Sequence, residues 1–225
     1  MIGTRRFERF FYAYEERFAP LEVVRTPETP EQMVVGEVSD SPGWVRWRLY
    51  PWTTSTDVLG DLEQSTGLKS PAVFREFITT FHTLRLDLGF IRFPRTPIGR
   101  EEKDIRRLLI GAPRDLIAKG YLPIGWYEGR GESGLYCFEL AGLRSENDDA
   151  PIACVRSRGA VEQRTSIASS LKVLIDALEF HLRSDVEFLG RNRLTDETDE
   201  YFERFLAHDP ETMASSGRAF WEALR

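Results

Sequence analysis

The sequence contains little cysteine. Its two cysteines, Cys137 and Cys154, each lie inside a short apolar run. A disulfide framework in a secreted chain of this length needs more cysteines than two. Cysteine is among the most frequently buried residue types, so we expect two free thiols in the core. The apolar neighbours of Cys137 are expected to raise its pKa and to make it inert as a nucleophile.

Long hydrophobic runs are also missing. No stretch approaches the roughly 18 apolar residues that a membrane span requires, which excludes a transmembrane helix. The segment Met1–Phe18 carries acids and arginines among its apolar positions, a pattern that does not fit a secretory signal peptide. We therefore expect a cytoplasmic protein that has no membrane partner.

Motifs that carry chemistry are scarce as well. The three histidines, His82, His181 and His208, lie far apart in the sequence, and two of them fall on predicted helices, so a metal site has little support. The segment Gly131–Gly134 resembles a nucleophile elbow but is one residue too short. The glycines around it form neither a dinucleotide-binding nor a Walker-type phosphate loop. The sequence therefore predicts no catalytic residue, no metal and no cofactor.

The negative charge is concentrated near the C-terminus. Between Thr195 and Glu211 one base, Arg204, faces seven acids, and 1 − 7 = −6 equals the net charge of the whole chain. These acids are Asp196, Glu197, Asp199, Glu200, Glu203, Asp209 and Glu211. Such a cluster repels nucleic acid and attracts basic partners, and it is equally typical of a solvated helix face. We expect no nucleic-acid binding, and both interpretations of the acids stay open.

The N-terminal third has clear periodic patterns. Aromatic residues recur at helical spacing over residues 4–18, which predicts an amphipathic helix. Residues Met33–Val38 and Trp44–Tyr50 are expected to form a hairpin. A short helix is expected over Thr56–Gln64. A second follows with Ser70 as its N-cap and Pro71 at its first position, running to Phe81.

The remaining elements follow from the same patterns. Leu84–Phe90 alternates apolar and polar residues, which predicts a half-buried strand. Leu171–Leu182 continues an amphipathic helix that we expect to begin behind a Thr165/Ser166 cap. The other expected elements are helices over Arg100–Ile110 and Pro113–Lys119, strands over Tyr121–Tyr127, Leu135–Leu140 and Ile152–Val155, and helices in the acidic tail around Tyr201–Leu206 and Phe220–Leu224.

These elements predict an α+β fold, with an antiparallel sheet of about five to six strands flanked by helices. We expect one globular domain over residues 1–225. Its core spans approximately 56–183, with an N-terminal helix and hairpin over 1–55 and an acidic helical extension over 184–225.

The segment Gly120–Leu140 resembles the central signature of the SUKH superfamily, the relatives of the yeast cell-wall-synthesis regulator. The resemblance lies in Leu122-Pro123-Ile124-Gly125, in the glycine-containing turn that follows, and in Cys137-Phe138-Glu139-Leu140. The helix that contains Pro71, Phe74 and Phe77 matches the family's upstream helix. The resemblance covers roughly residues 56–183. The family's usual Asn-Gly after this helix is replaced by Thr83-Leu84-Arg85, so the chain is similar to a divergent member.

The resemblance implies function by binding. Bacterial members are predominantly immunity proteins that neutralise toxins, often nucleases, and the eukaryotic regulator is a signalling scaffold. The resemblance therefore implies a non-enzymatic protein that occludes a basic toxin domain. Partner-binding candidates are the acids and aromatics near the signature and in the tail: Trp126, Tyr127, Glu128, Asp148, Asp149, Asp196, Glu197, Asp199 and Glu200.

Two alternatives remain at this point: a regulatory scaffold of the same fold, and a small-molecule-binding protein or enzyme with a cleft near Gly125–Gly134. The sequence leaves the oligomeric state open, because the N-terminal aromatic helix can pack within the chain or at an interface.

Overall fold

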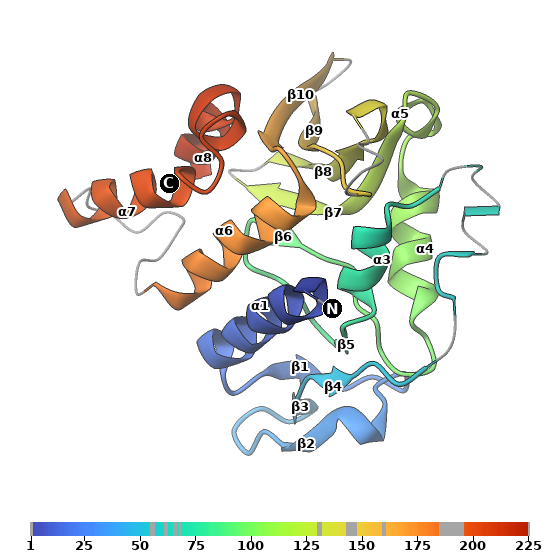
Figure 1. The fold of residues 1–225 in the computed structure, drawn as a ribbon. Coiled ribbons are helices and arrows are strands. Elements are labelled where there is room, and N and C mark those ends of the chain that lie inside the picture. The colour runs from blue at the N-terminus through green and yellow to red at the C-terminus, as the bar shows by residue number, and fades with distance from the viewer. Residues whose placement is uncertain are drawn as a thin grey trace.

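The computed structural model of the chain describes residues 2–54, 57–60, 63–64, 67, 69–129, 132–142, 148–158, 161–184 and 196–224. Helices surround a five-stranded antiparallel sheet, and two smaller sheets lie at the other end of the molecule (Figure 1). This combination confirms the α+β class. One cluster of buried apolar side chains extends from Phe7 to Leu224, so the segments at both ends of the chain share the core with the central residues.

The sheets and helices have the following bounds. The five-stranded sheet has the strand order β10 (Val161–Ala168), β9 (Ile152–Arg158), β8 (Glu132–Glu139), β7 (Tyr121–Gly129) and β6 (Ile91–Arg92). The two small sheets are β1 (Glu22–Val24), β3 (Trp44–Trp47) and β2 (Val34–Glu37), and the pair β4 (Tyr50–Pro51) and β5 (Phe81–His82). The α-helices are α1 (Ile2–Phe18), α3 (Ala72–Ile78), α4 (Glu102–Gly111), α5 (Arg114–Ala118), α6 (Leu171–Arg183), α7 (Asp196–Leu206) and α8 (Arg218–Leu224). Shorter turns are η1 (Glu31–Met33), η2 (Leu140–Gly142) and the π-helical η3 (Thr212–Ser216).

The two faces of the five-stranded sheet differ in what covers them. Side chains alternate between faces along a strand, and on β8 Tyr136 and Phe138 point into the main core. Cys137 belongs to a small second cluster with Leu116 of α5 and Val155 of β9. We call the face of Tyr136 the inner face and the face of Cys137 the outer face. The helices α6 and α8 cover the inner face, and α5 covers part of the outer face.

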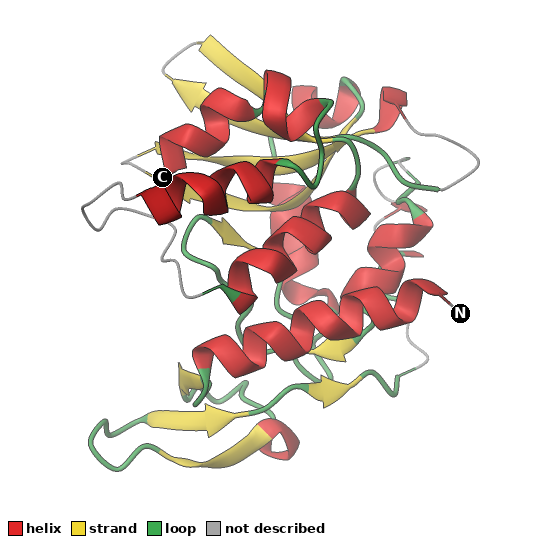
Figure 2. Ribbon diagram, turned by 60° about the vertical axis from the view of Figure 1, so that its left-hand side comes forward, coloured by secondary structure: helices red, strands yellow, loops and turns green. Residues whose placement is uncertain are grey.

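The helix α1 lies between α6 and the small sheets (Figure 2). Its aromatic stripe is buried as the spacing predicted, except for Phe18, which is 42% exposed. Phe7, Phe10 and Phe11 all pack against Phe77 of α3, with ring centroids 5.4 to 5.9 Å apart. Arg6 and Arg9 pair with acids of α6, among them Asp176 at 3.1 Å from Arg6. The helix therefore packs within the chain.

The C-terminal segment closes the inner face of the sheet. Phe220 of α8 lies 5.7 Å from Tyr127 and 6.2 Å from Tyr136, measured between ring centroids. Trp221 is fully buried, and its indole N–H donates to the carbonyl of Ile167 on β10 at 3.0 Å. Gly217 lets the backbone approach β10, because a Cβ there would lie 3.0 Å from the carbonyl oxygen of Ser166. The described part of the acidic extension, residues 196–224, is therefore part of the core rather than a loose tail.

Two predicted helix caps are wrong. Thr165 and Ser166 belong to β10, and the helix α6 begins later, where the Ser170 hydroxyl accepts a hydrogen bond from the amide of Val173 at 3.2 Å. Ser70 does not cap α3, which begins at Ala72. The amide of Ala72 donates instead to the carboxylate of Asp148 at 2.7 Å. A cap supplied from so distant a residue leaves no local sequence signal.

The predicted helix over residues 71–81 is too long. It ends at Ile78, and Phe81 and His82 form β5, which pairs with β4. His82 is therefore buried on a strand rather than placed on a helix. The predicted hairpin strand Trp44–Tyr50 is divided for the same reason, because Tyr50 leaves β3 to pair with His82.

The predicted strand Leu84–Phe90 does not form a continuous ladder of hydrogen bonds with a neighbouring strand. The expected alternation of burial is present, with Leu84, Leu86 and Leu88 inside. The backbone nevertheless forms one isolated bridge, between Asp87 and Arg92. A turn at Gly89, with φ of 89°, sends the chain back into β6. The predicted helix Thr56–Gln64 falls partly on residues outside the described ranges. The other expected elements are present, and β10 is a strand that the sequence patterns did not predict.

We expect the substitution Gly134→Ala to lower the free energy of unfolding by about 1–3 kcal/mol. A Cβ on Gly134 would lie 2.5 Å from the backbone oxygen of Val155 on the neighbouring strand. Gly36→Ala on β2 is the control, because a Cβ there meets no atom within 4 Å. Urea unfolding measures both variants. Equal stability of the two would show that the close approach of β8 and β9 does not require glycine.

Candidate functional site

The outer face of the sheet carries Trp126 and Glu128 on β7. The guanidinium of Arg92 on β6 lies 5.0 Å from the centre of the Trp126 ring and 3.2 Å from the Glu128 carboxylate. Leu135 of β8 is the cross-strand neighbour of Trp126 and is also partly exposed. The two candidates therefore lie close together, but an arginine of the same chain already covers part of the indole.

Tyr127 lies on the other side of the sheet. It is buried against Tyr136 and Phe220, and burial raises the pKa of its hydroxyl. The structure separates Tyr127 from Trp126, because adjacent residues of a strand point to opposite faces. Tyr127 is a core residue, which corrects its prediction as an aromatic anchor for a partner.

Asp148 and Asp149 act as helix caps. Asp148 has a positive φ of 44° and accepts from Ala72 at the start of α3. The buried carboxylate of Asp149 accepts from the amides of Leu171 at 3.0 Å and Lys172 at 3.3 Å at the start of α6. These bonds satisfy amide groups that a helix leaves unpaired. Asp149, with an exposed fraction of 5%, is thus a structural residue, which corrects its prediction as a partner contact.

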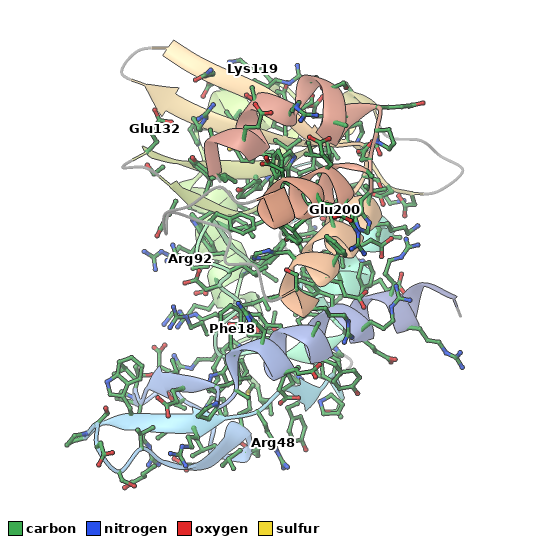
Figure 3. The ribbon with its side chains drawn as sticks, turned by 90° about the vertical axis from the view of Figure 1, so that its left-hand side faces the viewer. Phe18, Arg48, Arg92, Lys119, Glu132 and Glu200 are labelled. Carbon is green, nitrogen blue, oxygen red and sulfur yellow. The ribbon has the colours of Figure 1, made fainter. Side chains whose placement is uncertain are left out.

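The acidic extension presents an exposed face. The underside of α7 is buried through Tyr201, Phe202 and Phe205, which leaves Asp199 and Glu200 exposed. Figure 3 views this side of the molecule, with Glu200 in front and Arg92 and Glu132 at its edge. Asp196 and Glu197 begin the same helix, and their side chains lie outside the described part of the structure.

These candidates do not form one site. The helix α7 packs on α6 and on Trp221 of α8, which covers the inner face of the sheet, while Trp126 and Glu128 lie on the outer face. The sequence predicted Trp126, Glu128 and the acids of α7 together as partner contacts, whereas the structure places the β7 residues and the α7 acids on two different surfaces.

Both cysteines and His82 are buried, His181 is partly buried, and His208 is exposed. Cys137 and Cys154 are free thiols, as expected, and burial raises the pKa of Cys154 to about 12. His181 is partly buried beneath α7, where its Nδ1 lies 2.8 Å from the Tyr201 hydroxyl. Burial lowers the pKa of His181 to about 4. The described residues contain no group of three or more His, Cys, Asp or Glu side chains arranged to hold a metal ion.

The glycines of the signature have a packing role. A Cβ on Gly125 would lie 2.8 Å from the Arg92 carbonyl oxygen, and Gly134 has the same relation to Val155. Both glycines allow neighbouring strands to approach closely. Their position inside the sheet offers no support for the predicted alternative of a ligand cleft near Gly125–Gly134.

A groove that the sequence did not reveal lies at the other end of the molecule. It has a volume of about 450 Å³ and is bounded by α1, the C-terminal turn of α3 and the β4–β5 pair. Aromatic walls come from Tyr12, Trp52 and Phe81, and carboxylates come from Glu8 and Glu76. One sequence feature could have pointed to this groove: Tyr12 is an aromatic residue that lies off the stripe of α1. In the structure its side chain is 53% exposed.

Comparisons with known proteins add no family assignment. No protein-family model matches the chain, and no curated protein matches it. The fold and the surfaces described above therefore define its class: an α+β protein with an aromatic core and acidic surfaces. None of the helices described is long and apolar enough to cross a membrane.

The capping role of Asp149 is testable by substitution. We expect Asp149→Ala to lower the free energy of unfolding by about 1–3 kcal/mol, because three buried or partly buried amides lose their acceptor. Asp149→Asn keeps one acceptor oxygen and should lose less. Chemical denaturation measures both. If alanine and wild-type protein unfold at the same denaturant concentration, the carboxylate does not stabilise α6.

The partly buried His181 predicts a pH dependence of stability. The pKa of His181 is about 4 in the folded chain and about 6.5 in an unfolded one. Between these values the unfolded chain binds the extra proton, so stability is lost as the pH falls from 6.5 to 4, with a slope of up to about 1.4 kcal/mol per pH unit. His181→Gln removes this contribution. The free energy of unfolding, measured by denaturation at several pH values in this range, should change less steeply with pH for the variant. Identical pH dependence of the two proteins would contradict the lowered pKa of His181.

Proposed function

We propose that this protein is a non-enzymatic, cytoplasmic protein-binding domain that neutralises a toxin domain by occluding it. The observation that carries the proposal is the exposed acidic side of α7, where Asp199 and Glu200 face outward from an anchored helix. The resemblance of Gly120–Leu140 to the SUKH signature supports the same conclusion, because its bacterial members are predominantly immunity proteins.

Anchoring is what makes these acids useful for recognition. The buried ring of Phe205 lies 5.0 Å from that of Trp221, and Phe180 of α6 stacks on Tyr201 at 5.3 Å. The helix therefore pays little conformational entropy when a partner binds, since its backbone is already ordered. Fixed acidic side chains accelerate the approach of a basic protein and suppress binding of acidic ones.

The burial of the thiols favours binding over nucleophilic catalysis. A reactive cysteine is partly exposed and has a lowered pKa, whereas Cys154 is fully buried and its pKa is raised to about 12. The main competing proposal is a regulatory scaffold of the same fold with an endogenous partner. It would use the same acidic face, and the identity of the partner distinguishes the two.

We expect the double substitution Asp199→Lys/Glu200→Lys to abolish protection of cells that produce the toxin encoded beside this gene. It should slow association with the purified toxin domain about tenfold or more, because it reverses the charge that attracts the partner. The measurements are growth on co-expression and the association rate at low salt.

The matched control is Glu37→Lys/Asp40→Lys, which reverses two exposed acids near the β2–β3 turn. Each double substitution changes the net charge of the chain by +4, from −6 to −2. Equal loss in both variants would reduce the effect to overall charge and reject α7 as the contact. A wild-type protein that neither binds nor protects against any neighbouring toxin would overturn the proposed function.

A further inference from the structure

The groove between α1, α3 and β4–β5 combines aromatic rings with carboxylates. Tyr12 and Phe81 meet edge to face, with centroids 5.5 Å apart. Trp52 stacks on the buried ring of His82, 4.4 Å away and inclined by only 12°. Its indole N–H donates to the Thr54 carbonyl at 2.8 Å, which fixes the ring plane. The groove therefore has rigid aromatic walls, and its volume of about 450 Å³ is within the range of ligand sites.

The polar groups of the groove are suited to accept hydrogen bonds. Glu8 and Glu76 contribute carboxylates from two different helices. The hydroxyls of Thr79 and Thr80 donate back to the carbonyls of Arg75 and Glu76, at 2.7 and 2.8 Å. Their protons are thus already used, and their oxygens can only accept. A ligand that fits this lining brings donors and positive charge.

Two neighbouring arginines of the chain are directed elsewhere. Arg75, beside Glu76, pairs with Asp57 and Glu63. Arg9, beside Glu8, pairs with Asp176 and Glu179. Within the described residues, the Glu8 carboxylate has no ion-pair partner within 4.0 Å, and the residue lines the groove.

We infer that this groove receives the side chain of an arginine from a basic segment of a partner protein. A guanidinium group has five donors and no acceptor, stacks flat on an indole ring and pairs with carboxylates. Cations are attracted to the faces of Trp and Tyr rings. Burial lowers the pKa of His82 behind Trp52, so this ring is neutral near pH 7 and does not repel the cation. The inference does not depend on α7 or on the partner being a toxin.

The test uses the full chain labelled with ¹⁵N and the tripeptide acetyl-Gly-Arg-Gly-amide. The indole N–H resonance of Trp52, assigned with Trp52→Phe, reports on the groove directly. We expect it to shift saturably with the arginine peptide. The matching peptide with citrulline, a neutral isostere of arginine, should bind at least about fivefold more weakly, because it lacks the charge.

Two protein variants complete the test. Glu8→Gln should weaken binding of the arginine peptide about fivefold, and Tyr12→Leu, which keeps the apolar bulk, should weaken it through loss of the ring face. Glu16→Gln is the control, because Glu16 lies two turns along the same helix and pairs with Arg183 at 3.5 Å. Preserved amide spectra establish that each variant is folded.

Several results would overturn the inference. These are no shift of the Trp52 resonance, equal affinity for the arginine and citrulline peptides, or no effect of Glu8→Gln in a folded protein. Tighter binding of an acetyl-Gly-Lys-Gly-amide or of a quaternary ammonium ion would reject arginine as the occupant. None of these results bears on toxin protection, which depends on α7, so failure here and failure of the proposed function are distinguishable.

Discussion

The inner face of the five-stranded sheet is aromatic, and its exclusion from water determines how the rest of the chain is arranged. Tyr127, Tyr136 and Phe138 are all buried on this face. The helix α6 covers only part of it, and Phe220 and Trp221 complete the cover. Buried aromatics of this size contribute the largest apolar areas of a core. The helix α8 is therefore part of the same core as the sheet.

The same constraint fixes the direction of the acidic side chains. Because Tyr201, Phe202, Phe205 and Leu206 are buried, Asp199 and Glu200 lie on the exposed side of α7. In an amphipathic helix, burial of the apolar side turns the charged side toward solvent. At the other end of the molecule the aromatic stripe of α1 does the same. Its contacts with Phe77 turn Tyr12 and Glu8 toward β4–β5.

Elements with strong periodicity could be predicted from the sequence. The stripe of α1, the apolar face of α6 and the β7–β8 hairpin all appear near the expected residues, because hydrophobic spacing determines which face is buried. Elements fixed by distant partners could not be predicted. The cap of α3 comes from Asp148, and β5 forms only because Tyr50 pairs with His82. The alternating apolar residues at Leu84–Leu88 correctly predict which side chains are buried. Alternate burial does not require that the backbone pairs with another strand.

Sites were harder to predict than elements, and the reason is geometric. A list of acids and aromatics does not say which faces they share. Adjacent residues Trp126 and Tyr127 separate onto opposite faces of the sheet, while Glu8, Trp52 and Glu76, far apart in sequence, meet in one groove. Gly125 and Gly134 of the signature allow neighbouring strands to pack closely. The exposed sides of the helices around the sheet, such as α1 and α7, are not restricted by close contact between strands. The two contact surfaces proposed above therefore lie on α7 and in the groove beside α1, not on the segment that defines the resemblance.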